Sequence, residues 1–240
     1  MEMPQANTSL HPLLSHTLAT QRPRVGWIAL NQAPQFLHFH MNLFTQISRK
    51  AAISHVSVSS QYLPFLRLHP RAICLTDNAL PTPGLDPWFQ RLWDATLDYV
   101  LRGGTVICMG SFSSSVRPEH LKAFFSMAGL LWEVGDFHRT TVYLNKEYVP
   151  EDLQPYLADV YSVKGMFLKG VDPAEAWYLP GEKSINEDIV WDKEPVNTEN
   201  TPVARAKVGD GYVCFVGDCK IEPESRMAIL AMCGLHEAGL

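Results

Sequence analysis

The sequence predicts an α/β protein with a mainly parallel central sheet, and a strand–helix–strand unit is the clearest sign of it. Residues 71–77, RAICLTD, and 105–110, TVICMG, are apolar through their centres, which is typical of strands covered on both faces. Between them, apolar residues recur at spacings of three and four over 89–100, which predicts an amphipathic helix that ends at Gly103 and Gly104. A crossover helix of this kind joins strands that pair in parallel.

Size and composition favour one domain over residues 1–240. The chain has a formal net charge of -5 and no run of like charges, so we expect no nucleic acid and no membrane as partner. Its five cysteines form no C-x-x-C pair and its histidines lack metal-ligand spacing, so we expect free thiols, no metal and no cofactor. Without an apolar block at the N-terminus fit for a signal peptide, a cytoplasmic protein is expected.

The first part of the chain contributes less regular patterns. Residues 1–23 lack clear periodicity and are interpreted as an N-terminal arm. Residues 25–30 predict a first strand, and 53–58 alternate apolar with polar residues, as an edge strand does. Between these strands a helix is expected from about residue 36 to Arg49 and Lys50, with His38 and His40 as surface or half-buried side chains.

The second half of the chain is expected to extend this core. Residues 130–134 and 140–144 predict two strands around a turn or bulge at 135–139. Residues 150–201 are interpreted as an irregular insertion or cap, in which 162–168 and 176–179 could pair as short strands.

The chain should close with a β-hairpin and a helix. Residues 202–208 and 212–216 flank a glycine-rich turn, which predicts the hairpin. Pro223 opens the last helix, which we expect to face Met227 and Leu230 inward and to end at Gly234.

Polar residues follow the predicted parallel strands at their carboxyl ends, where ligands bind in open α/β sheets. Asp77, Ser111, Ser113 and Asp218 should therefore lie near one another. The alternative is that the carboxylates cap neighbouring loops through backbone N–H groups, and that the serines form a solvated turn or a helix cap.

Acid–base chemistry is the catalytic hypothesis that these residues support. His138 would be the acid or base, Asp218 or Asp77 its partner, and Arg139 a clamp for an anion. This requires the connection at 135–139 to fold over the same edge, and an exposed strand pair is the competing interpretation. Trp177 could line a sugar site, although packing within the cap explains it more simply.

The order of RAICLTD, YVLRGGTVICMG and TPVARAKVGDGYVCFVGD with a closing helix resembles the class I glutamine amidotransferase-like superfamily. Within it the likeness is to the trehalose-utilisation (ThuA-like) branch and to a group of fungal proteins. The resemblance covers most of residues 71–234 and implies a flavodoxin-like three-layer α/β/α sandwich.

In the catalytic members of that superfamily the strand that resembles 105–110 ends in a nucleophile elbow, G-x-C-x-G, and a histidine follows the late strand. Cys108 and Gly110 match C-x-G, which makes Cys108 the candidate nucleophile, but Val106 stands where the first glycine should be. The late strand is followed by Asp218 and not by histidine, so glutaminase chemistry is not expected.

Two classes of function follow. The first is an enzyme that performs acid–base chemistry on a small polar, carbohydrate-like or biosynthetic substrate. The second is a non-catalytic member of the fold that binds a ligand or a protein, for instance as a homodimer.

Overall fold

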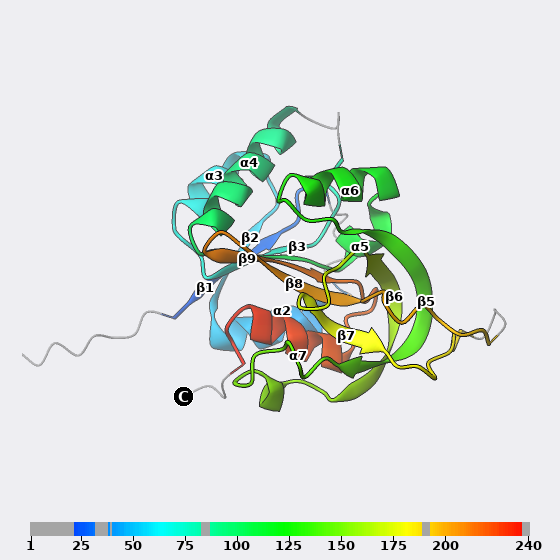
Figure 1. Ribbon diagram of the computed structural model, residues 1–240. Helices are drawn as coiled ribbons and strands as arrows, with labels where there is room; N and C mark the ends of the chain where they lie inside the picture. The colour runs from blue at the N-terminus through cyan, green and yellow to red at the C-terminus, as the bar shows by residue number, and fades with distance from the viewer. Residues whose placement is uncertain (1–21, 32–37, 39, 83–86, 189–192, 237–240) are drawn as a thin grey trace, which may run out of the picture.

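The computed structural model describes residues 22–31, 38, 40–82, 87–188 and 193–236, and the expected N-terminal arm lies almost wholly outside these ranges. A nine-stranded sheet lies between two layers of helices (Figure 1). The strands run in the order β2-β1-β3-β4-β9-β8-β7-β5-β6. Their bounds are β1 Arg24–Ile28, β2 Ala52–Val56, β3 Ala72–Leu75, β4 Thr105–Cys108, β5 Glu133–Leu144, β6 Val160–Lys169, β7 Ala176–Pro180, β8 Val203–Val208 and β9 Gly211–Val216.

Helices cover both faces of the sheet (Figure 1). The helices α3, α4 and α6 lie on one face, and α2 and α7 lie on the other. Their bounds are α2 Met41–Lys50, α3 Ser59–Leu66, α4 Pro87–Leu101, α5 Ser111–Ser115, α6 Pro118–Ser126 and α7 Pro223–Met232, with a 3-10 turn η1 at Gln154–Tyr156. None of the helices in the described ranges has the length and apolar character that a membrane span needs.

The parallel half of the sheet confirms the strand–helix–strand unit. β4 pairs in parallel with β3 on one side and with β9 on the other, and every residue of β3 and β4 is buried. β2 forms the edge beside β1 as expected. Apolar side chains on both faces of β3 and β4 are needed because helices cover both.

The sheet as a whole is mixed, which corrects the expectation of a mainly parallel one. β8 and β9 form the expected antiparallel hairpin, with Gly209 at φ +60° in its turn. β7 then pairs antiparallel with β8 and β5, and β6 pairs antiparallel with β5. The segment 150–201 therefore contributes two strands of the main sheet, and these strands do not pair with each other as expected.

β5 is one continuous strand of twelve residues, where two strands around a turn were expected. The pairing with β6 shifts between Val134 and Phe137, which is a β-bulge. Asp136, His138 and Arg139 consequently lie on a strand and not on a connection that could fold over the edge of the sheet.

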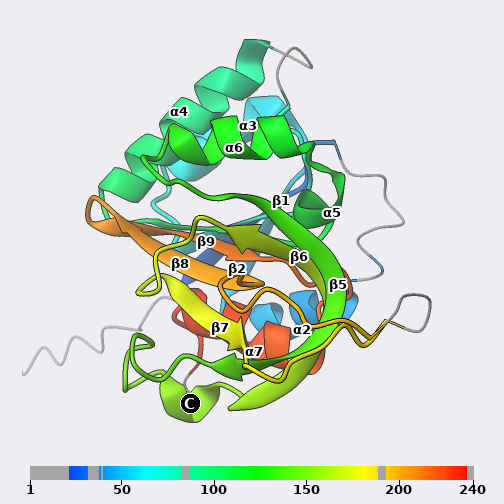
Figure 2. The ribbon, with the colours of Figure 1, turned by 45° about the vertical axis from the view of Figure 1, so that its right-hand side comes forward.

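The antiparallel half curls until β6 meets the end of β9 (Figure 2). The Met166 N–H donates to the Gly217 carbonyl at 3.0 Å, and Gly165 forms a bridge with Asp218. A Cβ on Gly165 would lie 2.2 Å from the Gly217 oxygen, so this approach requires glycine.

Two hydrophobic cores form, one on each face. Trp27, Cys74 and Phe167 belong to the core under α2 and α7, whereas Cys108 and Phe112 belong to the core under α3, α4 and α6. α7 faces Ala228 and Ile229 inward, and Met227 is 38% exposed, so the inward orientation expected for Met227 is wrong.

Candidate ligand site at the carboxyl edge

The chain turns sharply at Gly110, between β4 and α5. Gly110 has φ +64° and ψ −128°. This backbone conformation is strained for any residue that has a Cβ atom, whereas glycine adopts it readily. A tight strand-to-helix turn of this kind is the geometry of a nucleophile elbow. The residue at the turn is therefore glycine, which has no side chain to act as nucleophile.

His40 lies directly over this turn. A Cβ on Gly110 would lie 2.8 Å from the His40 Nε2 atom, so the imidazole occupies the space that a side chain at the turn would take. The His40 side chain is 3% exposed, and its Nδ1 has no hydrogen-bond partner among the described residues. Burial lowers the pKa of His40, which keeps the ring neutral near pH 7. The sequence predicts a surface or half-buried side chain for His40, whereas the structure buries it.

The end of β3 is tied to the end of β1 through Asp77. The Asn31 N–H donates to Asp77 Oδ2 at 2.7 Å, and the Ala79 N–H donates to Asp77 Oδ1 at 3.0 Å. Burial raises the pKa of Asp77, although these backbone donors oppose the shift. β1 leads to β2 on one side and lies beside β3 on the other, so Asn31 and Asp77 meet where the strand order reverses.

Asn78 extends these contacts to α5. Its side chain accepts a hydrogen bond from the Asn31 amide at 3.2 Å and donates one to the Ser115 carbonyl at 3.2 Å. The Ser115 hydroxyl in turn donates to the Ser111 carbonyl. Polar groups that follow β1, β3 and β4 therefore line the carboxyl edge.

The end of β9 completes this edge. The Ser113 hydroxyl donates to the Gly110 carbonyl at 2.8 Å and lies 3.4 Å from the Gly217 carbonyl oxygen. Asp218, which is fully buried, accepts the backbone N–H groups of Lys220 and Glu222 at 2.8 and 2.7 Å. The structure thus brings Asp77, Ser111, Ser113 and Asp218 to one edge, and it shows both carboxylates bonded to backbone N–H groups, as the capping alternative held.

Cys108 lies two residues before the turn, inside β4. Its side chain is buried in the core under α3, α4 and α6, and burial raises the pKa of the thiol well above its ordinary value. The C-x-G match therefore does not place the cysteine at the nucleophile position. The turn falls on Gly110, two residues after Cys108. A neutral, inaccessible thiol is a poor nucleophile.

His138 lies in β5, where it pairs with Gly165 of β6. Its ring stacks on Phe167 with centroids 4.3 Å apart, and Phe167 belongs to the core under α2 and α7. Phe112 of α5 belongs to the opposite core. Burial lowers the pKa of His138, with Asp136 and Asp188 acting against the shift. The expected pairing of His138 with Asp77 or Asp218 does not appear among the described contacts.

Arg139 points to the opposite face of β5 from His138 and is held by a neighbouring carboxylate. Its Nη2 atom lies 2.9 Å from Glu222 Oε1, and its Nη1 atom donates to the Ser162 hydroxyl at 3.3 Å. The hydrogen bond that Arg139 donates to the Glu222 carboxylate raises the pKa of Arg139. Its charge is already compensated, which weakens the interpretation as a clamp for a substrate anion.

Trp177 packs in the core beside Arg205 and is 1% exposed. It lies in β7, so core packing, the simpler alternative, describes its surroundings. Among the described residues no group of three or more histidine, cysteine, aspartate or glutamate side chains could hold a metal ion.

Comparisons with known proteins rest on structure alone. A scan against protein-family models gives no match, and neither does a search of the curated proteins. A ThuA-like protein from Bacteroides uniformis ATCC 8492 superposes with a TM-score of 0.59 at 13% identity, over 98% of this chain and 95% of that one. A ThuA-like protein from Parabacteroides merdae ATCC 43184 gives 0.57 at 12% identity, over 89% of both chains.

The same fold occurs within a larger enzyme. A β-galactosidase from Bacillus circulans sp. alkalophilus superposes with a TM-score of 0.54 at 12% identity, over 89% of this chain and 31% of that one. The two ThuA-like proteins, by contrast, match over nearly their whole length. The chain therefore shares the fold of the ThuA-like proteins.

Proposed function

We propose that this protein is a non-catalytic, ligand-binding member of the ThuA-like branch of the class I glutamine amidotransferase-like superfamily. The observation that carries the proposal is the glycine at the nucleophile turn, with His40 packed over it. A covalent mechanism needs a nucleophile at that turn. In this proposal the carboxyl edge binds a ligand, whereas the turn has no side chain that could react with it.

A flavodoxin-like core is part of the proposal. The five parallel strands follow the order β2-β1-β3-β4-β9, which supports a doubly wound arrangement with its switch point between β1 and β3. Asp77 and Asn31 meet at that point.

The ligand that we propose for this edge is a small hydroxyl-rich molecule such as a sugar. Carboxylate, amide and hydroxyl groups line the edge, and such groups both donate to and accept from sugar hydroxyls. The β-galactosidase that contains this fold is named for a carbohydrate substrate, and the resemblance of the sequence to the trehalose-utilisation branch supports the same class of ligand.

A thermal-shift titration with trehalose, glucose and galactose tests the proposal. We expect one of these sugars to raise the unfolding temperature of the wild type. In Asn78→Ala the affinity should fall about three- to tenfold, the effect of one lost hydrogen bond. The control, Asn197→Ala, removes the same side chain from the loop before β8 and should leave the affinity unchanged. No stabilisation by any sugar, or equal losses in both variants, would refute a sugar site at this edge.

An acid–base enzyme is the second candidate, on the strength of one observation. The buried Nε2 atom of His138 has no hydrogen-bond partner among the described residues, and its lowered pKa favours the neutral, basic ring. Turnover of a stabilising sugar by the wild type, abolished in His138→Gln, would favour this candidate over simple binding.

A further inference from the structure

Two adjoining hollows lie at the amino ends of the parallel strands, at the opposite end of these strands from the carboxyl edge. The first has a volume of about 700 Å³, and the second has a volume of about 500 Å³. Arg71, immediately before β3, and Gly103, before β4, line both of them. A molecule bound in either hollow would therefore lie beside Arg71, and it could extend past Arg71 into the other hollow.

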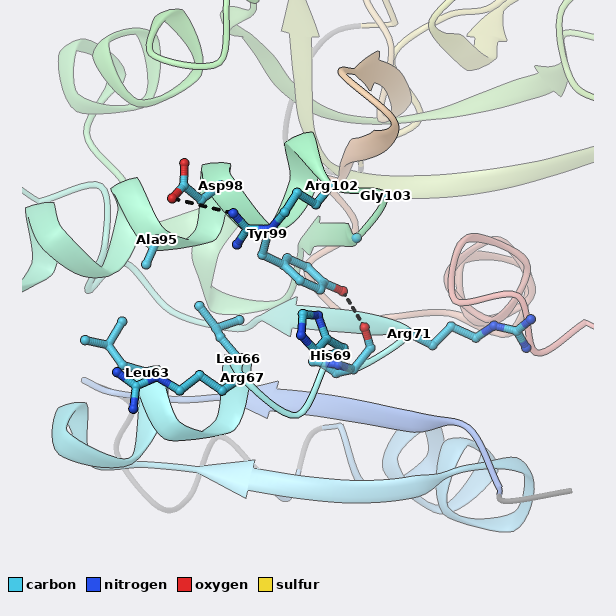
Figure 3. Close-up of a pocket in the computed structure, with 12 residues that line it drawn as sticks. Leu63, Leu66, Arg67, His69, Arg71, Ala95, Asp98, Tyr99, Arg102 and Gly103 are labelled. Carbon is cyan, nitrogen blue, oxygen red and sulfur yellow. Dashed lines mark hydrogen bonds and ion pairs between the residues drawn. The ribbon is translucent and has the colours of Figure 1, made fainter. Parts of the chain in front are cut away.

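The first hollow is lined by both apolar and charged side chains. Leu63 and Leu66 of α3 face Ala95 of α4 across it (Figure 3). Arg102 lies 3.9 Å from Asp98, and both side chains are about two-thirds exposed. The Tyr99 hydroxyl donates to the Pro70 carbonyl at 3.0 Å, so it is already bonded.

The second hollow contains a stacked arginine for which the described residues provide no anionic partner. The guanidinium of Arg205 lies 3.4 Å from the ring centroid of Tyr212 and 5.5 Å from that of Trp177. Its buried Nε atom has no hydrogen-bond partner among the described residues, and no carboxylate in that part of the chain lies within ion-pair distance of it. Aromatic rings on a guanidinium face fix its plane and leave its N–H edge for a ligand.

A second arginine extends into the same space. Figure 3 shows the Arg71 side chain pointing away from His69 and Tyr99, toward α7. Its Nη1 atom donates to the Gly234 carbonyl at 3.1 Å, and the described residues provide no ion pair for it. The hollow also contains His236, whereas Asp152 is the one carboxylate among its described lining residues.

We propose that the second hollow binds the oxyanion group of a small molecule, a phosphate or a carboxylate. Arg71 and Arg205 are the residues that would hold this group. Planar guanidinium groups bind such anions through paired N–H donors. The neighbouring hollow provides space for an apolar part of the same molecule. This site is separate from the carboxyl edge and does not depend on the function proposed there.

Calorimetric titration with inorganic phosphate, phenyl phosphate and phenylacetate tests the site. We expect phenyl phosphate to bind more tightly than inorganic phosphate, because its ring can enter the apolar hollow. Arg205→Gln and Arg71→Gln should each weaken binding about tenfold. The comparison of phenyl phosphate with phenylacetate shows which of the two anions the site prefers.

Arg91→Gln is the matched control, because Arg91 also lies over an aromatic ring, that of Trp88, at 5.6 Å, but outside both hollows. It should leave binding unchanged. Arg205→Lys keeps the charge without the planar group, and it should bind weakly while unfolding at the wild-type temperature, which separates loss of the site from loss of the fold. Absence of binding to the wild type, or equal weakening in Arg91→Gln, would overturn the proposal.

Discussion

At the scale of single residues, the carboxyl edge combines polar groups at the strand ends with a sharp turn at Gly110. Asp77, Ser111, Ser113 and Asp218 follow parallel strands, and the carboxyl ends of parallel strands share one edge. Cys108 matched a motif by spacing, but the positive φ that defines the turn falls on Gly110. The burial of His40 carries no local signal, because it depends on how the residue before α2 packs against the turn at Gly110.

The contact between His40 and Gly110 leads to a stability prediction. Gly110→Ala should lower the free energy of unfolding by about 1–3 kcal/mol through backbone strain, and by more through displacement of His40. Gly129→Ala is the control, because Gly129 also has positive φ, +77°, but a Cβ there would contact nothing within 4 Å. Urea denaturation should show a larger loss of unfolding free energy for Gly110→Ala than for Gly129→Ala. Adding His40→Ala to the Gly110→Ala variant should recover part of that loss. Equal losses in the two glycine variants would mean that His40 does not restrict the turn.

The buried histidines predict a pH dependence. The pKa values of His40 and His138 lie below the ordinary 6.5 in the folded protein, so the unfolded chain takes up protons that the folded protein does not. The free energy of unfolding should therefore fall as the pH decreases from about 7 through the window between the unfolded and folded pKa values.

Replacement of one histidine isolates this effect. His138→Phe keeps a ring against Phe167 and removes the titrating group, so the decrease in stability between pH 7 and pH 5 should be smaller than in the wild type. The comparison between variants is needed because the raised pKa of Asp77 acts with the opposite sign at lower pH. An unchanged pH profile in denaturation experiments would contradict a lowered pKa for His138.

At the scale of elements, prediction succeeded where the local pattern was strong. β3, α4 and β4 were predicted because their apolar residues have clear strand and helix periods. β5 was divided in two because Gly135 and the charged residues after it resemble a turn, and α3 was missed because it is short and contains Pro64. The partners of β6 and β7 depend on tertiary packing that local sequence does not encode.

Closure of the antiparallel half depends on Gly165. Gly165→Ala would place a Cβ 2.2 Å from the Gly217 carbonyl oxygen, so β6 would have to move away from the end of β9. We expect a loss of more than about 2 kcal/mol in the free energy of unfolding. Gly181→Ala should be milder, since the Cβ would meet the Tyr143 ring, which is 49% exposed and free to shift. Similar losses in both variants would argue against a tight β6–β9 contact.

At the scale of the whole molecule, the two ends of the parallel strands differ in chemistry. The carboxyl edge has buried carboxylates, an amide and serine hydroxyls, whereas the amino edge has hollows with arginines. The sequence predicted the first of these edges from strand polarity. It gave no indication of the second, because Arg71 and Arg205 lie far apart in the chain and meet only in the folded sheet.

Hydrogen–deuterium exchange with a stabilising sugar is the most direct test of the central claim, that a small polar ligand binds at the carboxyl edge. The account predicts slower exchange in residues 28–31, 75–79 and 109–116, because a ligand there would cover the ends of β1, β3 and β4. Protection confined to residues 66–71 and 99–105, at the amino ends of the strands, would contradict it.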